Sequence, residues 1–183
     1  MVWGCFTAGG TGALHKIDGI MKQENDVDIL KQHLKTSVRK LKLGRKWVFQ
    51  MDNDPKHTSK VAAKWLKDNK VKVLEWPSQS PDLHPIEDLW ADLKKCVRAR
   101  RPTNLTQSWW NCQEEWAKIH PTYCGKLVEG FWKRLTQVKQ FKGNATKYEL
   151  SVCKPTGNVM KEIKAEINHS TIILTFHILK IKW

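Results

Sequence analysis

The chain has 183 residues, of which 32 are Lys or Arg and 18 are Asp or Glu, giving a formal net charge of +14 at pH 7. This length suits one ordinary domain with its own core and is too short for two. So large an excess of positive charge indicates a polyanionic partner, with nucleic acid as the first candidate and a merely well-solvated surface as the alternative. No signal peptide opens the chain, and no apolar run reaches the roughly 18 residues of a membrane helix, so neither secretion nor a membrane span is expected.

The front half of the sequence alternates strand and helix patterns. Residues 1–6 read as a strand, and residues 12–17 as the returning strand of a hairpin after a glycine-rich turn. Apolar residues then recur at helical spacing over residues 23–42. Residues 46–51 are aromatic and β-branched, which predicts a short central strand.

The second half continues with further helices and one strand. A helix is expected to begin near Thr58 or Ser59 and to lead to a strand over residues 71–76. Pro85 suits the first position of the next helix. That helix is expected to run to residue 100, and two more are expected over 104–119 and 122–139. This order of elements is typical of an α/β domain.

The five cysteines argue against a disulfide or zinc scaffold. Their number is odd, their spacings are wide, and no C-x-x-C motif occurs. Cys112, His120 and Cys124 come nearest to the spacing of zinc ligands, but no fourth ligand with matching spacing accompanies them. Ordinary buried thiols in a reducing compartment are therefore expected.

Two acidic residues stand where a metal site could form in this basic chain. Asp52 falls where an apolar strand ends, and ligand sites of open α/β sheets form outside the carboxyl ends of strands. Glu87 lies in the first turn of the helix that Pro85 opens. Two converging carboxylates would suit Mg²⁺ or Mn²⁺, and paired ions of this kind activate water or a 3′-hydroxyl against a phosphodiester. Turn chemistry at Asp52 and the helix dipole at Glu87 explain both residues without a metal, so both interpretations stay open.

A longer pattern surrounds these two residues. WVFQMDNDPKHTS at 47–59, followed by LEWPSQSPDLHPIEDLW at 74–90, resembles the catalytic core of mariner-superfamily transposases, and the likeness to their Sleeping Beauty branch covers residues 1 to about 148. That family uses an Asp, Asp, Glu triad on a ribonuclease H-like fold. The resemblance implies that Asp52 is the second triad Asp and Glu87 the triad Glu. It also implies Mg²⁺ or Mn²⁺ as cofactor, DNA as partner and a nuclear location.

The resemblance also implies what this chain lacks. The family carries its first triad Asp on a strand upstream of the segment that matches residues 2–6, so that Asp and its strand are expected to be missing. In the family fold this strand lies mid-sheet, between the hairpin and the strand ending at Asp52, and its loss should leave two unpaired edges. The expected fold is therefore α/β: a truncated ribonuclease H-like fold, with a mixed sheet lacking its first strand, flanking helices, C-terminal helices and an unrelated tail. Catalytic inactivity follows as an expectation, because one metal ligand of three is absent.

The last 35 residues have no counterpart in the family pattern. We expect residues 1–148 to form the partial catalytic domain and residues 149–183 to be a poorly ordered tail. Within that tail, residues 170–183 are apolar and β-prone, and nothing in the preceding pattern offers them a partner. This run is therefore interpreted as an aggregation liability.

Basic residues beside the motifs are predicted to hold DNA through its phosphates, without reading sequence. The basic helix face over residues 31–46 is a second candidate, and a solvated charge run is the alternative for each segment. His57 could approach DNA or merely cap a helix. The predicted phosphate contacts are Lys56, His57, Lys60, Lys94, Lys95, Arg98, Arg100 and Arg101.

Two functions therefore remain possible from the sequence: a transposase enzyme, and a non-catalytic DNA-binding protein derived from a transposon. No small-molecule substrate is expected, and the sequence does not indicate the oligomeric state.

Overall fold

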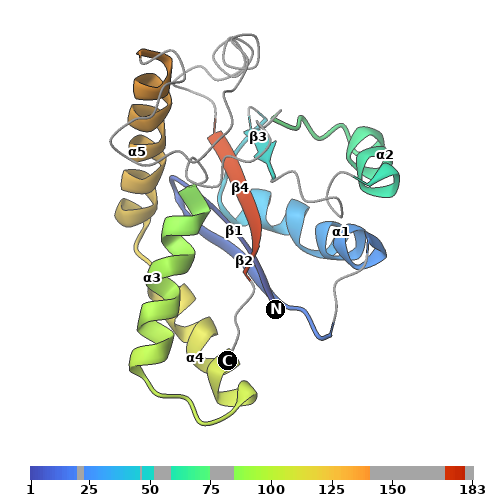
Figure 1. Ribbon diagram of the computed structural model, residues 1–183. Helices are drawn as coiled ribbons and strands as arrows, with labels where there is room; N and C mark the ends of the chain where they lie inside the picture. The colour runs from blue at the N-terminus through green and yellow to red at the C-terminus, as the bar shows by residue number, and fades with distance from the viewer. Residues whose placement is uncertain (20–22, 46, 52–58, 75–84, 141–171, 180–183) are drawn as a thin grey trace.

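The computed structural model describes residues 1–19, 23–45, 47–51, 59–74, 85–140 and 172–179 (Figure 1). Its elements follow the predicted alternation of strands and helices. In chain order they are β1 (Val2–Thr7), β2 (Gly10–Lys16), α1 (Gln23–Lys40), β3 (Trp47–Gln50), α2 (Lys60–Asp68), α3 (Pro85–Ala99), α4 (Leu105–Lys118), α5 (Pro121–Gln140) and β4 (Ile172–Leu179).

The four strands form one mixed sheet in the order β2-β1-β4-β3. The predicted hairpin is confirmed, because β1 pairs antiparallel with β2. β4 pairs antiparallel with β1 on one side and parallel with β3 on the other. The strand predicted over residues 71–76 is represented by an isolated parallel bridge between Phe49 and Val73, and residues 75 and 76 lie outside the described part of the chain.

The position of β4 corrects the expectation for the apolar run near the C-terminus. That run was expected to have no partner, yet Ile172–Leu179 pairs with both neighbouring strands. The expectation of two unpaired edges between the hairpin and the strand before Asp52 is wrong for the same reason. An apolar, β-prone segment without Pro can satisfy the backbone groups of both edges at once. Residues 149–171 lie outside the description.

Local signals place the helix starts. The Ser59 side chain accepts a hydrogen bond from the Ala62 N–H at 3.2 Å, and the Asn104 side chain accepts one from the Gln107 N–H at 2.8 Å. Both are N-caps, which satisfy amide groups that a helix end would leave unpaired. Pro85 occupies the first position of α3, as predicted, where its missing N–H is not needed.

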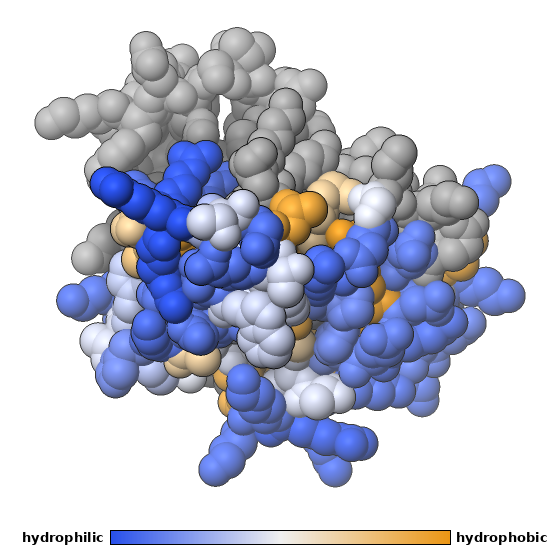
Figure 2. Space-filling model, turned by 90° about the horizontal axis from the view of Figure 1, so that it is seen from below, coloured by the Kyte–Doolittle hydropathy of each residue, from blue (hydrophilic) through white to orange (hydrophobic). Residues whose placement is uncertain are grey.

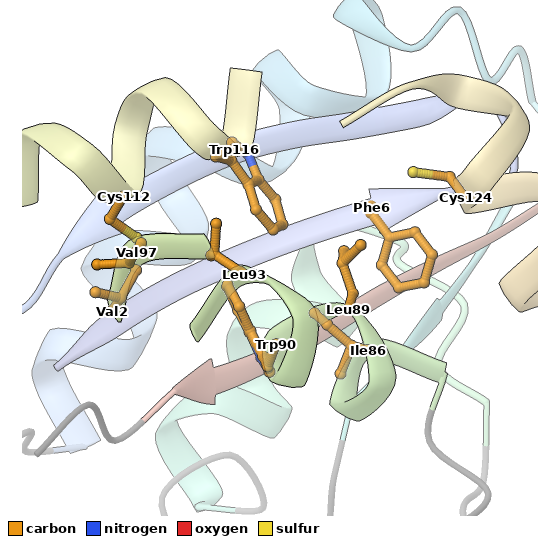
Figure 3. Close-up of a cluster of buried hydrophobic side chains, with 10 residues drawn as sticks. All are labelled: Val2, Phe6, Ile86, Leu89, Trp90, Leu93, Val97, Cys112, Trp116 and Cys124. Carbon is orange, nitrogen blue, oxygen red and sulfur yellow. The ribbon is translucent and has the colours of Figure 1, made fainter. Parts of the chain in front are cut away.

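The helices cover the sheet on both faces (Figure 1). Trp3, Cys5 and Phe49 belong to a buried cluster with side chains of α1 and α2. Val2 and Phe6 belong to a second cluster with side chains of α3, α4 and α5 (Figure 3). Alternate β1 residues therefore serve opposite faces, as the pleat of a strand requires. Within the described residues, no helix has the length and apolar character needed to cross a membrane.

Candidate metal site and nucleic-acid surface

The two predicted metal ligands differ in how far the structure describes them. Glu87 is half-buried in the first turn of α3, where Asp88 is also acidic. β3 ends at Gln50, and Asp52 follows two residues later in the sequence, in the stretch 52–58 that lies outside the described residues. The distance between the carboxylates of Asp52 and Glu87 is therefore not part of the description, and their pairing stays a prediction.

The described residues do place the start of α3 level with the end of β3. Phe6 and Ile86 belong to one buried cluster, and Figure 3 shows them at the same end of it. In the sheet, Phe6 pairs with Thr175, which in turn pairs with Gln50. Ile86 thus lies over the row of residues that ends β3. Glu87 is the next residue after Ile86, so the chain brings the helix start and the strand end to one level.

The same face of the sheet carries both features. Phe49 points into the cluster beneath α1 and α2. Because successive strand residues point to opposite faces, the fully buried Gln50 faces α3. The last residue of β3 and the first turn of α3 therefore share a face as well as a level. This arrangement is what a site built from a strand end and a helix start needs.

Aromatic packing holds α3 in this position. Trp90 is fully buried and stacks on Trp116 of α4, with ring centroids 5.1 Å apart and an interplanar angle of 24°. The Trp116 Nε1–H donates a hydrogen bond to the Gly12 carbonyl at 3.2 Å, which ties α4 to β2. Stacked aromatic pairs contribute about 1 kcal/mol beyond the area they bury. The helix that carries Glu87 is thus fixed from below by the sheet and from the side by α4.

The candidate zinc ligands do not assemble. No group of three or more His, Cys, Asp or Glu able to hold a metal occurs among the described residues. Cys112 and Cys124 are buried among apolar side chains, and burial raises the pKa of Cys112 to about 12 and that of Cys124 to about 11. The His120 Nδ1 accepts the Thr122 N–H at 3.2 Å, next to the start of α5. The expectation of ordinary buried thiols is confirmed for Cys5, Cys112 and Cys124, whereas Cys96 is exposed.

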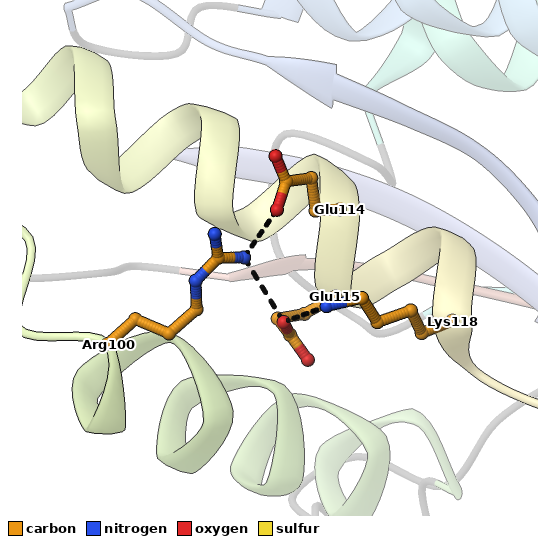
Figure 4. Close-up of polar contacts among 4 residues, drawn as sticks. All are labelled: Arg100, Glu114, Glu115 and Lys118. Atoms are coloured by element: carbon orange, nitrogen blue, oxygen red, sulfur yellow. Dashed lines mark hydrogen bonds and ion pairs between the residues drawn. The ribbon is translucent and has the colours of Figure 1, made fainter.

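Arg100 forms ion pairs with two glutamates of the protein itself. Its Nη1 lies 2.6 Å from Glu114 Oε2 and 3.2 Å from Glu115 Oε1, and Lys118 adds a second cation 2.8 Å from Glu115 (Figure 4). The hydrogen bond to Glu114 is the main cause that raises the pKa of Arg100, while Lys118 is the main cause that lowers the pKa of Glu115. Arg100 therefore links the residues after α3 to α4. Of the predicted phosphate contacts, it is the one that the described structure pairs with two carboxylates.

The other predicted contacts on α3 and immediately after it are less engaged by acidic residues. Lys95 is exposed and lies 3.2 Å from Asp92, one turn earlier. Lys94, Arg98 and Arg101 form no ion pair with another described residue, and Arg98 and Arg101 are exposed. Surface pairs such as Lys95–Asp92 contribute little and leave the cation accessible.

A second basic row lies on α2 and escaped the sequence interpretation. Lys60, one of the residues proposed to contact phosphate, is exposed at the start of α2, while Lys56 and His57 lie outside the described residues. Lys64 and Lys67 are also exposed and follow Lys60 at intervals of four and three residues, so all three lie on one side of the helix. This spacing was present in the sequence and would have revealed the row. Figure 2 shows how widely hydrophilic residues cover one face of the molecule.

A shallow pocket of about 230 Å³ opens between α3, α4 and the start of α5. The Tyr123 hydroxyl donates a hydrogen bond to Asp92 at its rim, and this bond is the main cause that lowers the pKa of Asp92. Among the described residues, neither Glu87 nor any predicted phosphate contact lines this pocket.

Comparison with known proteins agrees with the sequence resemblance. The family described as "DDE superfamily endonuclease" matches residues 1–108. The chain is 43% identical to the Transposable element Tcb1 transposase of Caenorhabditis briggsae and 38% identical to the Transposable element Tc1 transposase of Caenorhabditis elegans, each over 148 residues. These alignments cover 81% of this chain but 54% of each relative, so the chain spans about half the length of the curated relatives it matches. The chain belongs to the DDE superfamily endonuclease family, and its homologues include transposases of the Tc1/mariner type.

Proposed function

We propose that the chain is the ribonuclease H-like part of a transposase, in which Asp52 and Glu87 hold divalent metal ions and basic helices hold the DNA backbone. The observation that carries this proposal is the placement of the Glu87 helix start on the same face of the sheet as the end of β3, and level with it. Family membership supplies the class of chemistry, because members with this triad act on phosphodiesters.

The donor set fits hard divalent cations. Asp52 and Glu87 offer only carboxylate oxygens, which Mg²⁺ and Mn²⁺ prefer over nitrogen or sulfur. When bound, such ions activate the attacking oxygen and stabilise charge on the phosphate. The protein's own contribution is to carry the two carboxylates on separate elements, Asp52 shortly after the end of β3 and Glu87 on a helix anchored by Trp90 and Trp116.

DNA binding is the second part of the proposal. Exposed cations without described acidic partners occur on α2, in the last turn of α3 and just after α3: Lys60, Lys64, Lys67, Arg98 and Arg101. Cations spaced in this way neutralise phosphates and release counterions, which gives affinity without sequence preference. Lys94 and Lys95 add charge on the same helix as Arg98.

The alternative function is DNA binding without catalysis, since this sequence supplies the triad's second Asp and its Glu, and a third carboxylate remains unassigned. We propose that the isolated chain gives no divalent-dependent cleavage or joining of transposon-end DNA. If the chain cleaves DNA and this cleavage disappears in Asp52→Ala, another acidic residue of the chain must act as the third metal ligand. That result would favour the catalytic function over DNA binding alone.

Calorimetric titration with Mn²⁺ tests the metal site separately from catalysis. Wild-type protein is expected to bind the ion saturably, and Asp52→Asn or Glu87→Gln should weaken binding at least about tenfold. Asp88→Asn is the matched control, because Asp88 has the same charge in the same helical turn but is exposed. Equal losses of Mn²⁺ affinity in the Glu87 and Asp88 variants would show that only the general negative charge matters. That result would overturn the assignment of Glu87 as a metal ligand.

A further inference from the structure

β4 is the last element of the described chain, yet it lies inside the sheet between β1 and β3. It is a central strand, and it alone joins the two parts of the described sheet, because the order is β2-β1-β4-β3. Five register pairs link it to β1 and four link it to β3. Thirty-one residues separate it from the end of α5 at Gln140. Every other described strand comes from the first 50 residues.

The space that β4 fills is defined by those other elements. All six β1 residues are buried, as are the last three residues of β3. The two strands that flank β4 therefore both lie in the protein interior. α3 lies against β4 on one face of the sheet. Without β4, the facing edges of β1 and β3 would present unpaired N–H and C=O groups, which is the pattern that accepts an added strand.

The composition of β4 suits a segment that pairs with strands on both sides. Ile172–Leu179 reads IILTFHIL, with no Pro, Gly or formal charge, and five of its eight residues are β-branched or aromatic. Main-chain pairing on both edges would supply affinity independent of side chains, and apolar side chains would exclude water from it.

We propose that the space between β1 and β3 is a strand-binding groove, and that Ile172–Leu179 occupies it as a separable ligand held in cis. The groove takes an extended apolar segment that runs parallel to β3 and antiparallel to β1. The same segment, supplied as a free peptide, replaces β4 when the chain's own strand is disabled. This inference rests on the sheet alone and is independent of the proposed function.

A disulfide trap tests the placement and register in the full chain. Cys5 of β1 pairs directly with Phe176 of β4, and directly opposed residues of antiparallel strands lie within disulfide range. Phe176→Cys, refolded in a glutathione redox buffer with Cys96 and Cys153 changed to Ser, is expected to give a Cys5–residue 176 disulfide in peptide mass spectra. His177→Cys is the matched control, because residue 177 pairs with Gly4, one position away. Absence of the 5–176 link, or an equal yield from the 177 variant, would overturn the register.

Peptide complementation tests whether the strand is separable. Leu174→Pro in the full chain removes a ladder hydrogen bond in a central strand and is expected to lower the melting temperature by about 10 °C or more. Leu174→Ile, which keeps an apolar side chain and the N–H, should behave like wild type.

A labelled peptide of residues 171–182 should bind the Leu174→Pro protein saturably and raise its melting temperature, even if that variant is largely unfolded alone. Wild-type protein, whose groove is filled, should bind the peptide at least about tenfold more weakly. A peptide with the same proline should bind neither protein. Failure of the peptide to stabilise the proline variant, or equal binding to both proteins, would overturn the proposal.

Discussion

Gly4 lies directly beneath Trp90, so closely that a Cβ built on the glycine would come within 2.6 Å of the tryptophan Cη2 atom. The absence of a side chain on β1 is what lets α3 settle onto the sheet at this point. Because Glu87 lies one turn before Trp90 on the same helix, this contact also sets the height of the candidate metal ligand above the sheet.

Gly4→Ala should therefore destabilise the protein through overpacking. The Trp90 ring is fully buried and stacked on Trp116, so moving it would disturb packed neighbours. A loss of about 1–3 kcal/mol in the free energy of unfolding is expected from urea denaturation. Gly130→Ala in α5 is the control, since nothing lies within 4 Å of its added Cβ, and it should be neutral or stabilising. A Gly4→Ala protein as stable as wild type would show that α3 is not held at this contact.

Arg100 should contribute to the docking of α4 and little to DNA binding. Arg100→Ala removes the contacts to Glu114 and Glu115 and is expected to lower the melting temperature by no more than about 2 °C, because the network is at the surface. The salt dependence of DNA affinity should stay within about half a unit of the wild-type slope. A slope that fell by a full unit would show that Arg100 leaves the glutamates to contact phosphate.

Neutralising the α2 row should weaken DNA binding in a salt-dependent way. Lys60→Gln, Lys64→Gln and Lys67→Gln together should flatten the plot of log affinity against log salt by roughly one unit for each phosphate that the variant no longer neutralises. Fluorescence anisotropy with random duplex DNA measures this slope. Arg98→Gln with Arg101→Gln is the parallel test for the end of α3. If the α2 variant keeps the wild-type slope and the α3 variant does not, the phosphate path follows α3 alone.

His15 and His33 should make the fold sensitive to mild acid. The His15 Nδ1 and His33 Nε2 atoms lie 2.9 Å apart, and burial is the main cause that lowers the pKa of each below its usual value. The unfolded chain then binds protons more readily than the fold, so stability is fully present above the ordinary histidine pKa of about 6.5 and is lost as pH falls below it. The melting temperature of His33→Gln should vary less with pH between about 7 and 5 than that of wild type. An unchanged profile would show that other groups control acid sensitivity.

Much of the fold follows from local sequence signals. The hairpin, β3 and all five helices were predicted because their periodicity, Ser59, Asn104 and Pro85 act within a few residues. The partner of β4 was not predictable in this way, since it depends on which edges the first 50 residues leave open. Of the strand expected at residues 71–76, the described part, residues 71–74, forms a single parallel bridge to β3 through Val73.

The sequence proposes residues for the candidate site but does not predict how the surrounding elements are arranged. The family pattern implies roles for Asp52 and Glu87 that stay a prediction, whereas the structure shows that the start of α3 shares a face and a level with the end of β3. The pairing of Arg100 with Glu114 joins residues 14 positions apart on different elements, so charge counting could not reveal it. The row of lysines on α2 could have been predicted from its helical spacing in the sequence.

Mn²⁺ soaking of crystals is the sharpest test of whether Asp52 and Glu87 form one metal site, because anomalous scattering locates the ion without assumptions about activity. An anomalous peak is expected within about 2.5 Å of carboxylate oxygens from both Asp52 and Glu87, and it should be absent in Glu87→Gln crystals. Carboxylates more than about 10 Å apart, or Mn²⁺ bound at other residues with Asp52 and Glu87 uncoordinated, would contradict the proposed metal site.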